Sequence, residues 1–148
     1  RNLFPLIEEI ISRYELEPKF IGTFFGHRLK FVEGHYQRAD EFEYKMIRGL
    51  FKYLQNNDID IELARKMLPV FYEHPKMDFD SVLTSIDFKK IDKENLLDRI
   101  PFLKNKFDDI RKSKEKQDAV DWIMGELRPV AIGNINLKEL KNEIEKAI

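Results

Sequence analysis

The chain has 148 residues, a formal net charge of −1 and no cysteine, and 43% of its residues are hydrophobic. This length supplies core material for one domain or for two small helical subdomains, and the lack of cysteine excludes a disulfide framework and a cysteine-based zinc site. The near-zero net charge argues against a generally basic nucleic-acid binder but leaves a local cationic patch open.

No apolar run reaches the length of about 18 residues that a membrane span needs, and no signal-peptide pattern opens the printed sequence. A sequence without cysteine is compatible with the reducing cytoplasm, and we expect the protein to work there. Position 1 is Arg rather than Met, so we expect the chain to be a fragment of a longer protein.

Apolar residues at helical spacing predict a first helix over 3–14, with Pro5 in the first turn, where a missing N–H costs nothing. A second helix is predicted over 19–36. It is apolar over more than half of its circumference, which is typical of a central helix in a bundle. Asp40 and Glu43 form a capping-box pattern, so the next helix should begin directly after Asp40.

The following segments continue the helical pattern. Asp60 is the expected cap of a helix that contains Pro69, and proline inside a helix should kink it or end it early. Asp78 or Asp80 should cap a short helix after that. No segment alternates apolar and polar residues over a strand's length, so the predicted fold class is all-α.

The composition changes from aromatic-rich to highly charged near residue 90. We therefore predict two helical subdomains, a larger one over 1–90 and a small three-helix bundle over 91–148. Asp92 should cap the first helix of the smaller subdomain, and Pro101 should bend or divide that helix.

The C-terminal thirty residues predict a helical hairpin. Ser113 should cap a helix that carries Trp122 on its apolar face, where a core position is more common than a ring that stacks on a base. Pro129 should end or kink this helix just before it. Gly133 can adopt a left-handed conformation in the link, and Asn136 should cap the final amphipathic helix.

The same hairpin carries a family resemblance. Met124 and Gly125, then Gly133, then the amphipathic run over 137–144, resemble the C-terminal signature of the YqeY-like tail. This tail ends the B and E subunits of the tRNA-dependent amidotransferases. The segment over 57–68 resembles an upstream part of the same tail, and the two-subdomain architecture is also what the resemblance implies.

The resemblance implies a function as well. The tail would bind a misacylated tRNA, while other domains of a glutamyl-tRNA(Gln) or aspartyl-tRNA(Asn) amidotransferase carry out an ATP-dependent transamidation with glutamine as the amido donor. ATP and Mg²⁺ would belong to the parent, together with an amidase-type partner subunit. The type of parent, B or E, stays open, and no membrane or DNA partner is expected.

No catalytic constellation is visible in the sequence. His27, His35 and His74 lack the spacing of a helical metal pair, and adjacent carboxylates such as Asp108 and Asp109 point in different directions on a helix. The sequence contains no serine-hydrolase elbow and no phosphate-binding glycine loop. We expect this chain to hold no catalytic centre, metal or cofactor of its own.

The cations near the junction of two predicted helices are the best electrostatic candidates for contact with tRNA phosphates. The candidate tRNA-binding residues are Lys104, Lys106, Arg111, Lys112, Lys114, Lys116, Arg128, Lys138 and Lys141. Residues 91–148 contain twelve Lys or Arg and twelve Asp or Glu, so any RNA contact requires charge segregation.

Two observations leave alternatives open. Pro129 and Asn134 stand where the family pattern has cations, which weakens the case for RNA contact at the hairpin itself. The cationic segment could also be an ordinary exposed lysine-rich turn. The alternative function is therefore a non-catalytic helical module for protein–protein interaction.

Overall fold

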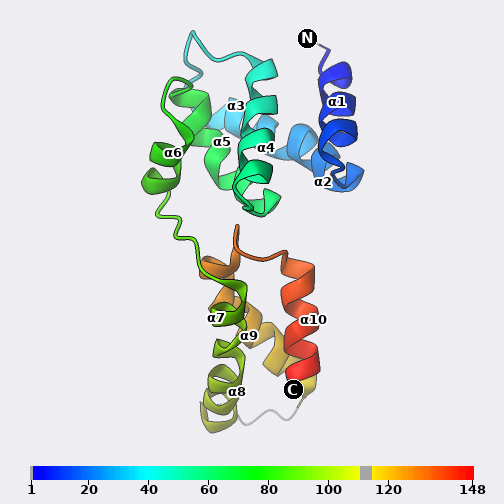
Figure 1. Cartoon of the computed structure of the whole chain (residues 1–148), viewed down its shortest axis with the longest axis vertical. Helices are drawn as coiled ribbons and strands as arrows, with labels where there is room; N and C mark the ends of the chain where they lie inside the picture. The colour runs from blue at the N-terminus through cyan, green and yellow to red at the C-terminus, as the bar shows by residue number, and fades with distance from the viewer. Residues whose placement is uncertain (1, 111–114) are drawn as a thin grey trace. The chain divides into compact units, whose positions relative to one another are not determined.

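The computed structural model describes residues 2–110 and 115–148, and within these ranges the chain forms helices and no strand. This confirms the predicted all-α fold (Figure 1). The chain divides into two compact units, Arg1–Phe88 and Lys89–Ile148, near the boundary expected at residue 90.

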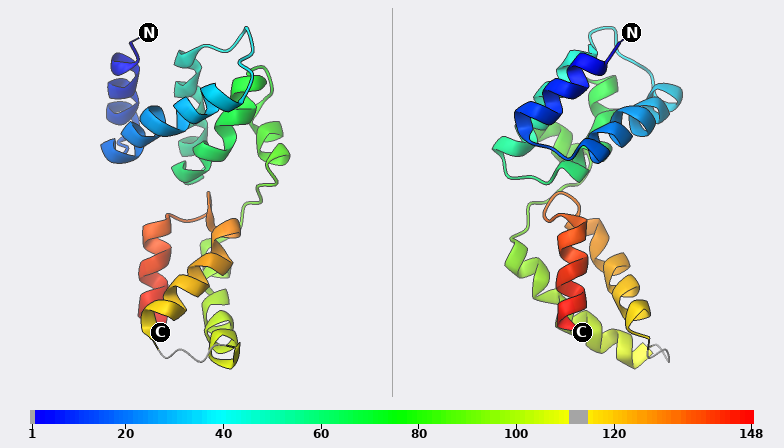
Figure 2. Two further views of the ribbon diagram at one scale, coloured as in Figure 1. Left: turned by 180° about the vertical axis from the view of Figure 1, so that it is seen from behind. Right: turned by 90° about the vertical axis from the view of Figure 1, so that its right-hand side faces the viewer.

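The first unit is built from helical segments of six to eleven residues and shorter 3₁₀ and π turns. In chain order these are α1 (Phe4–Tyr14), α2 (Pro18–Thr23), the π-helical η1 (Phe24–Arg28), α3 (Leu29–His35), η2 (Tyr44–Met46), α4 (Ile47–Asn56), η3 (Ile61–Leu63), α5 (Ala64–Glu73) and α6 (Phe79–Ser85). Helix α1 contacts α4 and α2, and α3 contacts α5 (Figures 1 and 2).

Aromatic rings form much of the core of this unit. Phe24 and Phe42 are fully buried and Phe51 is buried. The Phe24 ring lies edge-on to Phe51 at 5.2 Å between centroids, and Phe42 packs edge-on against Phe71 at 5.7 Å. Such edge-to-face pairs add to the free energy gained from burial alone.

The helix predicted over 19–36 is present, but a π turn interrupts its regular α geometry. Segments α2, η1 and α3 follow one another without a break, and η1 carries Phe24 and Phe25 on its buried side. A π turn inserts one extra residue into the helical repeat, which changes the direction of the side chains that follow. Arg28, the last residue of the π turn, contacts α5 through its side chain.

The predicted helix start at Asp40 is wrong. Residues 40–43 form a turn and loop, and helix begins only with η2 and α4. Tertiary contacts hold this loop instead: Phe42 is buried, Ala39 N–H donates to the Tyr72 carbonyl at 3.2 Å, and Arg38 Nη2 donates to the Phe42 carbonyl at 2.8 Å. Burial of one large aromatic side chain outweighs a local capping pattern.

Of the kink or early helix end expected at Pro69, the early end is wrong, because α5 continues through Pro69 to Glu73. Pro69 lies in the buried part of the unit, where tertiary packing compensates for the backbone hydrogen bond that proline cannot make.

The predicted caps at two aspartates are confirmed. Asp60 accepts a hydrogen bond from Glu62 N–H at 3.1 Å, and Asp78 accepts one from Ser81 N–H at 2.8 Å. The hydrogen bonds from Ser81 hold the pKa of the Asp78 carboxyl below its ordinary value of 3.8. Asp78, and not Asp80, is therefore the cap of α6.

The second unit contains α7 (Lys93–Leu97), α8 (Arg99–Ile110), α9 (Lys116–Ala131) and α10 (Leu137–Ala147). Asp92 caps α7 through Glu94 N–H at 3.4 Å. The helix predicted to start there is divided at Asp98, and Pro101 lies in the first turn of α8, where proline is tolerated. The expected three-helix bundle thus has its first helix split in two.

The core of this unit is aliphatic and is built by α7, α8, α9, α10 and the turn between α9 and α10. Its buried members are Leu96, Ile100, Val120, Ile123, Leu127, Ala131, Ile135, Leu140 and Ile144. Trp122 and Met124 are partly buried and pack against this core.

The C-terminal hairpin follows the sequence expectation except at one proline. Of the helix end or kink expected at Pro129, the end near Leu127 is wrong, because α9 continues through Pro129 to Ala131. Burial of Leu127 and Ala131 favours this continuation. Gly133 has φ 91°, and Asn136 accepts hydrogen bonds from Lys138 and Glu139 N–H at 2.9 and 3.2 Å, both as predicted. The expected cap Ser113 lies outside the described residues.

Candidate functional site

The candidate cations are spread over three helices of the second unit. Lys104 and Lys106 lie on α8, Lys116 and Arg128 on α9, and Lys138 and Lys141 on α10. The other three, Arg111, Lys112 and Lys114, lie outside the described residues, in the sequence between α8 and α9.

These cations do not form one patch. The C-terminal end of α8, the N-terminal end of α9 and the C-terminal end of α10 lie together at one end of the unit (Figures 1 and 2). Lys116 is at this end, whereas Arg128 is twelve residues further along α9, a distance of about 18 Å at 1.5 Å per residue. Lys138 is in the first turn of α10, at the other end.

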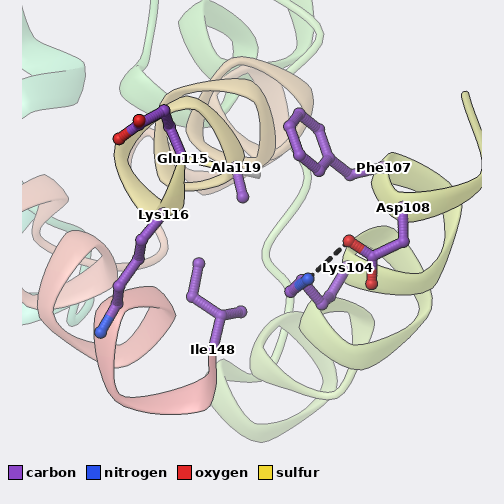
Figure 3. Close-up of a pocket in the computed structure, with 7 residues that line it drawn as sticks. All are labelled: Lys104, Phe107, Asp108, Glu115, Lys116, Ala119 and Ile148. Atoms are coloured by element: carbon purple, nitrogen blue, oxygen red, sulfur yellow. Dashed lines mark hydrogen bonds and ion pairs between the residues drawn. The ribbon is translucent and has the colours of Figure 1, made fainter. Parts of the chain in front are cut away.

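A small open pocket marks the end of the unit that carries Lys104 and Lys116 (Figure 3). Its volume is about 150 Å³. The lining residues are Lys104, Phe107, Asp108, Glu115, Lys116, Ala119 and Ile148. Each side of the pocket carries one lysine and one carboxylate, Lys104 with Asp108 on α8 and Lys116 with Glu115 at the start of α9, so the pocket itself is close to neutral (Figure 3).

One of the two lysines is already paired within its own helix. Lys104 Nζ lies 2.6 Å from Asp108 Oδ1, and the two residues are four positions apart on α8. A phosphate would have to compete with this carboxylate for Lys104. Lys106 and Lys116 are exposed, so they are the described cations best placed to reach a polyanion at this end.

The residues that carry the family resemblance serve the hairpin in different ways. Gly133 adopts the left-handed φ that disfavours other residues, and it lies in the turn between α9 and α10. Met124 packs against the aliphatic core. Gly125 is exposed within α9, and no neighbouring atom lies within 4 Å of the position that a Cβ would occupy.

Asn134 has a structural role that sequence reasoning did not assign. It is 8% exposed and is the one buried polar residue among residues 2–110 and 115–148. Its Oδ1 accepts from Ile91 N–H at 2.8 Å, and its Nδ2 donates to the carbonyls of Lys89 and Val130, both at 2.9 Å. The side chain therefore fastens the segment that leads into α7 to the α9–α10 turn.

Trp122 takes the core role that was expected for it. Its ring lies 5.8 Å from that of Phe107 on α8, with the planes inclined by 50°. A ring held against α8 in this way joins the two helices and has limited freedom to stack on a base.

No three His, Asp or Glu side chains in the described parts of the chain lie close enough to hold a metal ion together. Among the helices of residues 2–110 and 115–148, none combines the length and apolar character required to cross a membrane.

Comparison with known proteins leaves the family open. No family model, no curated protein and no solved structure matches this chain.

Proposed function

We propose that the chain is a tRNA-binding tail of an amidotransferase subunit of the B or E type. The observation that carries the proposal is the position of Lys106 and Lys116. They stand exposed on the two helices that flank 111–114, and this segment adds Arg111, Lys112 and Lys114 in the sequence. The resemblance of the C-terminal hairpin to the YqeY-like tail supports the same function.

The mechanism that we propose is electrostatic. Lysine and arginine side chains bind phosphates of the folded tRNA and fix its orientation, with little reading of base identity. Lys104 contributes less than Lys106 and Lys116, because Asp108 competes for its ammonium group. Arg128, Lys138 and Lys141 would contact the tRNA only where it reaches beyond this end of the unit.

The proposal assigns chemistry to other parts of the complex. The parent subunit would bind ATP and Mg²⁺ in another domain and use ammonia from glutamine, supplied by an amidase-type partner. The present chain would hold the misacylated tRNA in the cytoplasm while this reaction proceeds, without a catalytic group of its own.

A pair of charge-removing variants tests the proposal. The double variant Lys106→Gln with Lys116→Gln should weaken binding of unmodified tRNA by about tenfold, because each lost phosphate contact also lowers the counterion release that drives binding. The double variant Lys19→Gln with Lys52→Gln removes the same charge from exposed lysines on α2 and α4, and this matched control should leave the affinity nearly unchanged. Equal affinities for both proteins would contradict the assignment of the site.

A second candidate function rests on the face of α8 that also carries Lys106, because Phe102, Lys106 and Ile110 follow one another at intervals of four residues. Phe102 and Ile110 are 67% and 56% exposed, and large exposed apolar side chains on one helix are typical of a protein-interaction face. A Phe102→Ser variant that keeps tRNA binding but no longer binds the amidase-type subunit would support this function. Unchanged binding of both partners would remove it.

A further inference from the structure

The first unit presents a cluster of cationic and planar side chains on η1 and α3 that the tRNA proposal does not use. The guanidinium carbon of Arg28 lies 5.4 Å from the centroid of the Phe31 ring, and the Phe31 and His35 rings stack at 4.0 Å with an interplanar angle of 17°. Phe31 is 46% exposed, and His35 is exposed as well. Three planar groups thus form a ladder along the surface of one helix.

A second guanidinium adds to the positive charge at this place. Arg28 Nε donates to the backbone carbonyl of Arg65 at 2.8 Å, which brings the start of α5 next to α3. Burial lowers the pKa of Arg28, and the positive charge of Arg65 lowers it further. One carboxylate also lies here, since Glu62 Oε1 is 3.5 Å from Arg65 Nε.

The hydrogen bond to the Arg65 carbonyl uses only Nε of Arg28. Among the described residues, the terminal nitrogens of its guanidinium make no hydrogen bond within the protein, so they keep their capacity to donate. Two neighbouring guanidinium groups repel one another, and an anion between them would relieve the repulsion. An anion joined to a planar ring could contact the two guanidinium groups with its charge and the rings of Phe31 and His35 with its own ring.

We propose that the surface formed by Arg28, Phe31, His35 and Arg65 binds unpaired nucleotides of RNA. The arginines would bind phosphate, and a base would stack on the ladder of planar side chains. Cationic side chains with interleaved aromatic rings are the combination that single-stranded nucleic acid requires. This site lies wholly in the first unit and does not depend on the tRNA contacts proposed for the second.

The experiment measures the anisotropy of a fluorescent oligouridylate with the full chain at low salt. Phe31→Ala removes the stacking ring, and Arg65→Gln removes a charge but keeps the backbone carbonyl that Arg28 binds. Each should weaken the affinity by about 5- to 50-fold. Phe31→Ala loses the stacking of a base, and Arg65→Gln loses a contact with a phosphate. Circular dichroism checks that each variant keeps its helices.

Lys30→Gln is the matched control. Lys30 is an exposed cation on the same helix, two residues from Arg28 and so about 200° around the axis. It should change the affinity by less than about twofold. Equal losses in all three variants would show non-specific attraction and overturn the proposal.

Two further outcomes would also overturn it. One is the absence of oligouridylate binding by the unmodified chain. The other is binding of polyglutamate, weakened by Arg65→Gln, without binding of oligouridylate, which would identify an acidic protein as the partner of this surface.

Discussion

Arg28 Nε donates a hydrogen bond to the backbone carbonyl oxygen of Arg65 over 2.8 Å. In a regular helix this carbonyl would accept from the N–H of residue 69, but residue 69 is proline and has none. The side chain from the end of the π turn therefore replaces the missing backbone donor. Two local irregularities, a π turn in one helix and a proline in another, complement each other.

This relationship predicts a measurable coupling between two residues. Arg28→Met should lower the free energy of unfolding by about 1–2 kcal/mol, because it leaves a partly buried carbonyl without a donor. In a Pro69→Ala background the new N–H can bond to the Arg65 carbonyl, so the cost of Arg28→Met should fall to about half or less.

Urea unfolding measures this cycle in the first unit alone, because all five tyrosines of the chain lie before residue 89. Their ring proton NMR signals follow that unit separately from the signals of Trp122 in the second unit. Strictly additive effects of the two substitutions would contradict the compensation.

The buried amide of Asn134 should matter more to stability than its exposed counterpart Asn142. Asn134→Ala removes three hydrogen bonds and leaves the Ile91 N–H without its partner, so it should lower the free energy of unfolding by about 2–4 kcal/mol. Asn142→Ala should change it by less than about 0.5 kcal/mol. Fluorescence of Trp122, the single tryptophan, reports unfolding of this unit.

The two glycines of the hairpin motif should respond in opposite directions to alanine. Gly133→Ala places a Cβ on a residue with φ 91° and should destabilise the second unit by about 1–2 kcal/mol. Gly125→Ala adds a Cβ in open space on a helix and should stabilise it by about 0.5–1 kcal/mol. The same tryptophan measurement separates them, and destabilisation by both would show that Gly125 has a packing role.

Tyr53 should titrate above the ordinary range of tyrosine. Partial burial, followed by the 2.5 Å hydrogen bond from its hydroxyl to Asp80 Oδ1, raises its pKa to about 12 from 10.0. The neutral phenol is the form that the fold favours. The contribution of the neutral Tyr53 side chain to the free energy of unfolding is therefore complete below about pH 10. It is lost as the pH rises through about 12.

Carbon NMR of the tyrosine rings tests this titration. The signal that disappears in Tyr53→Phe should have a midpoint near pH 12, and Asp80→Asn should move that midpoint toward 10, because it removes the negative charge beside the hydroxyl. A midpoint near 10 in the unmodified chain would contradict the role of Asp80.

Sequence periodicity predicted the helices well because their apolar faces build the two cores. The caps at Asp60, Asp78, Asp92 and Asn136 were also predictable, since each depends on a side chain two or three residues from its partner. The helix start expected at Asp40 and the helix ends expected at Pro69 and Pro129 were wrong for one reason. In each case burial of side chains from distant parts of the chain outweighed a local backbone preference.

The candidate sites were harder to predict than the helices, because they depend on which side chains the fold brings together. A list of cations in sequence cannot show that Arg128 and Lys116 lie about 18 Å apart along a helix or that Lys104 is paired with Asp108. The surface formed by Arg28, Phe31, His35 and Arg65 could not be predicted for a related reason. Arg28 and Arg65 are 37 positions apart in the sequence, and only the fold brings them together.

The most direct test of the central claim is binding of unmodified tRNA, at about 50 and 200 mM salt, by this chain and by the amidotransferase subunit that we propose contains it. With three to five phosphate contacts, the affinity should fall by about 40- to 500-fold between the two salt concentrations. Absence of binding by both proteins at the lower salt concentration, or an affinity that salt does not change, would contradict the claim.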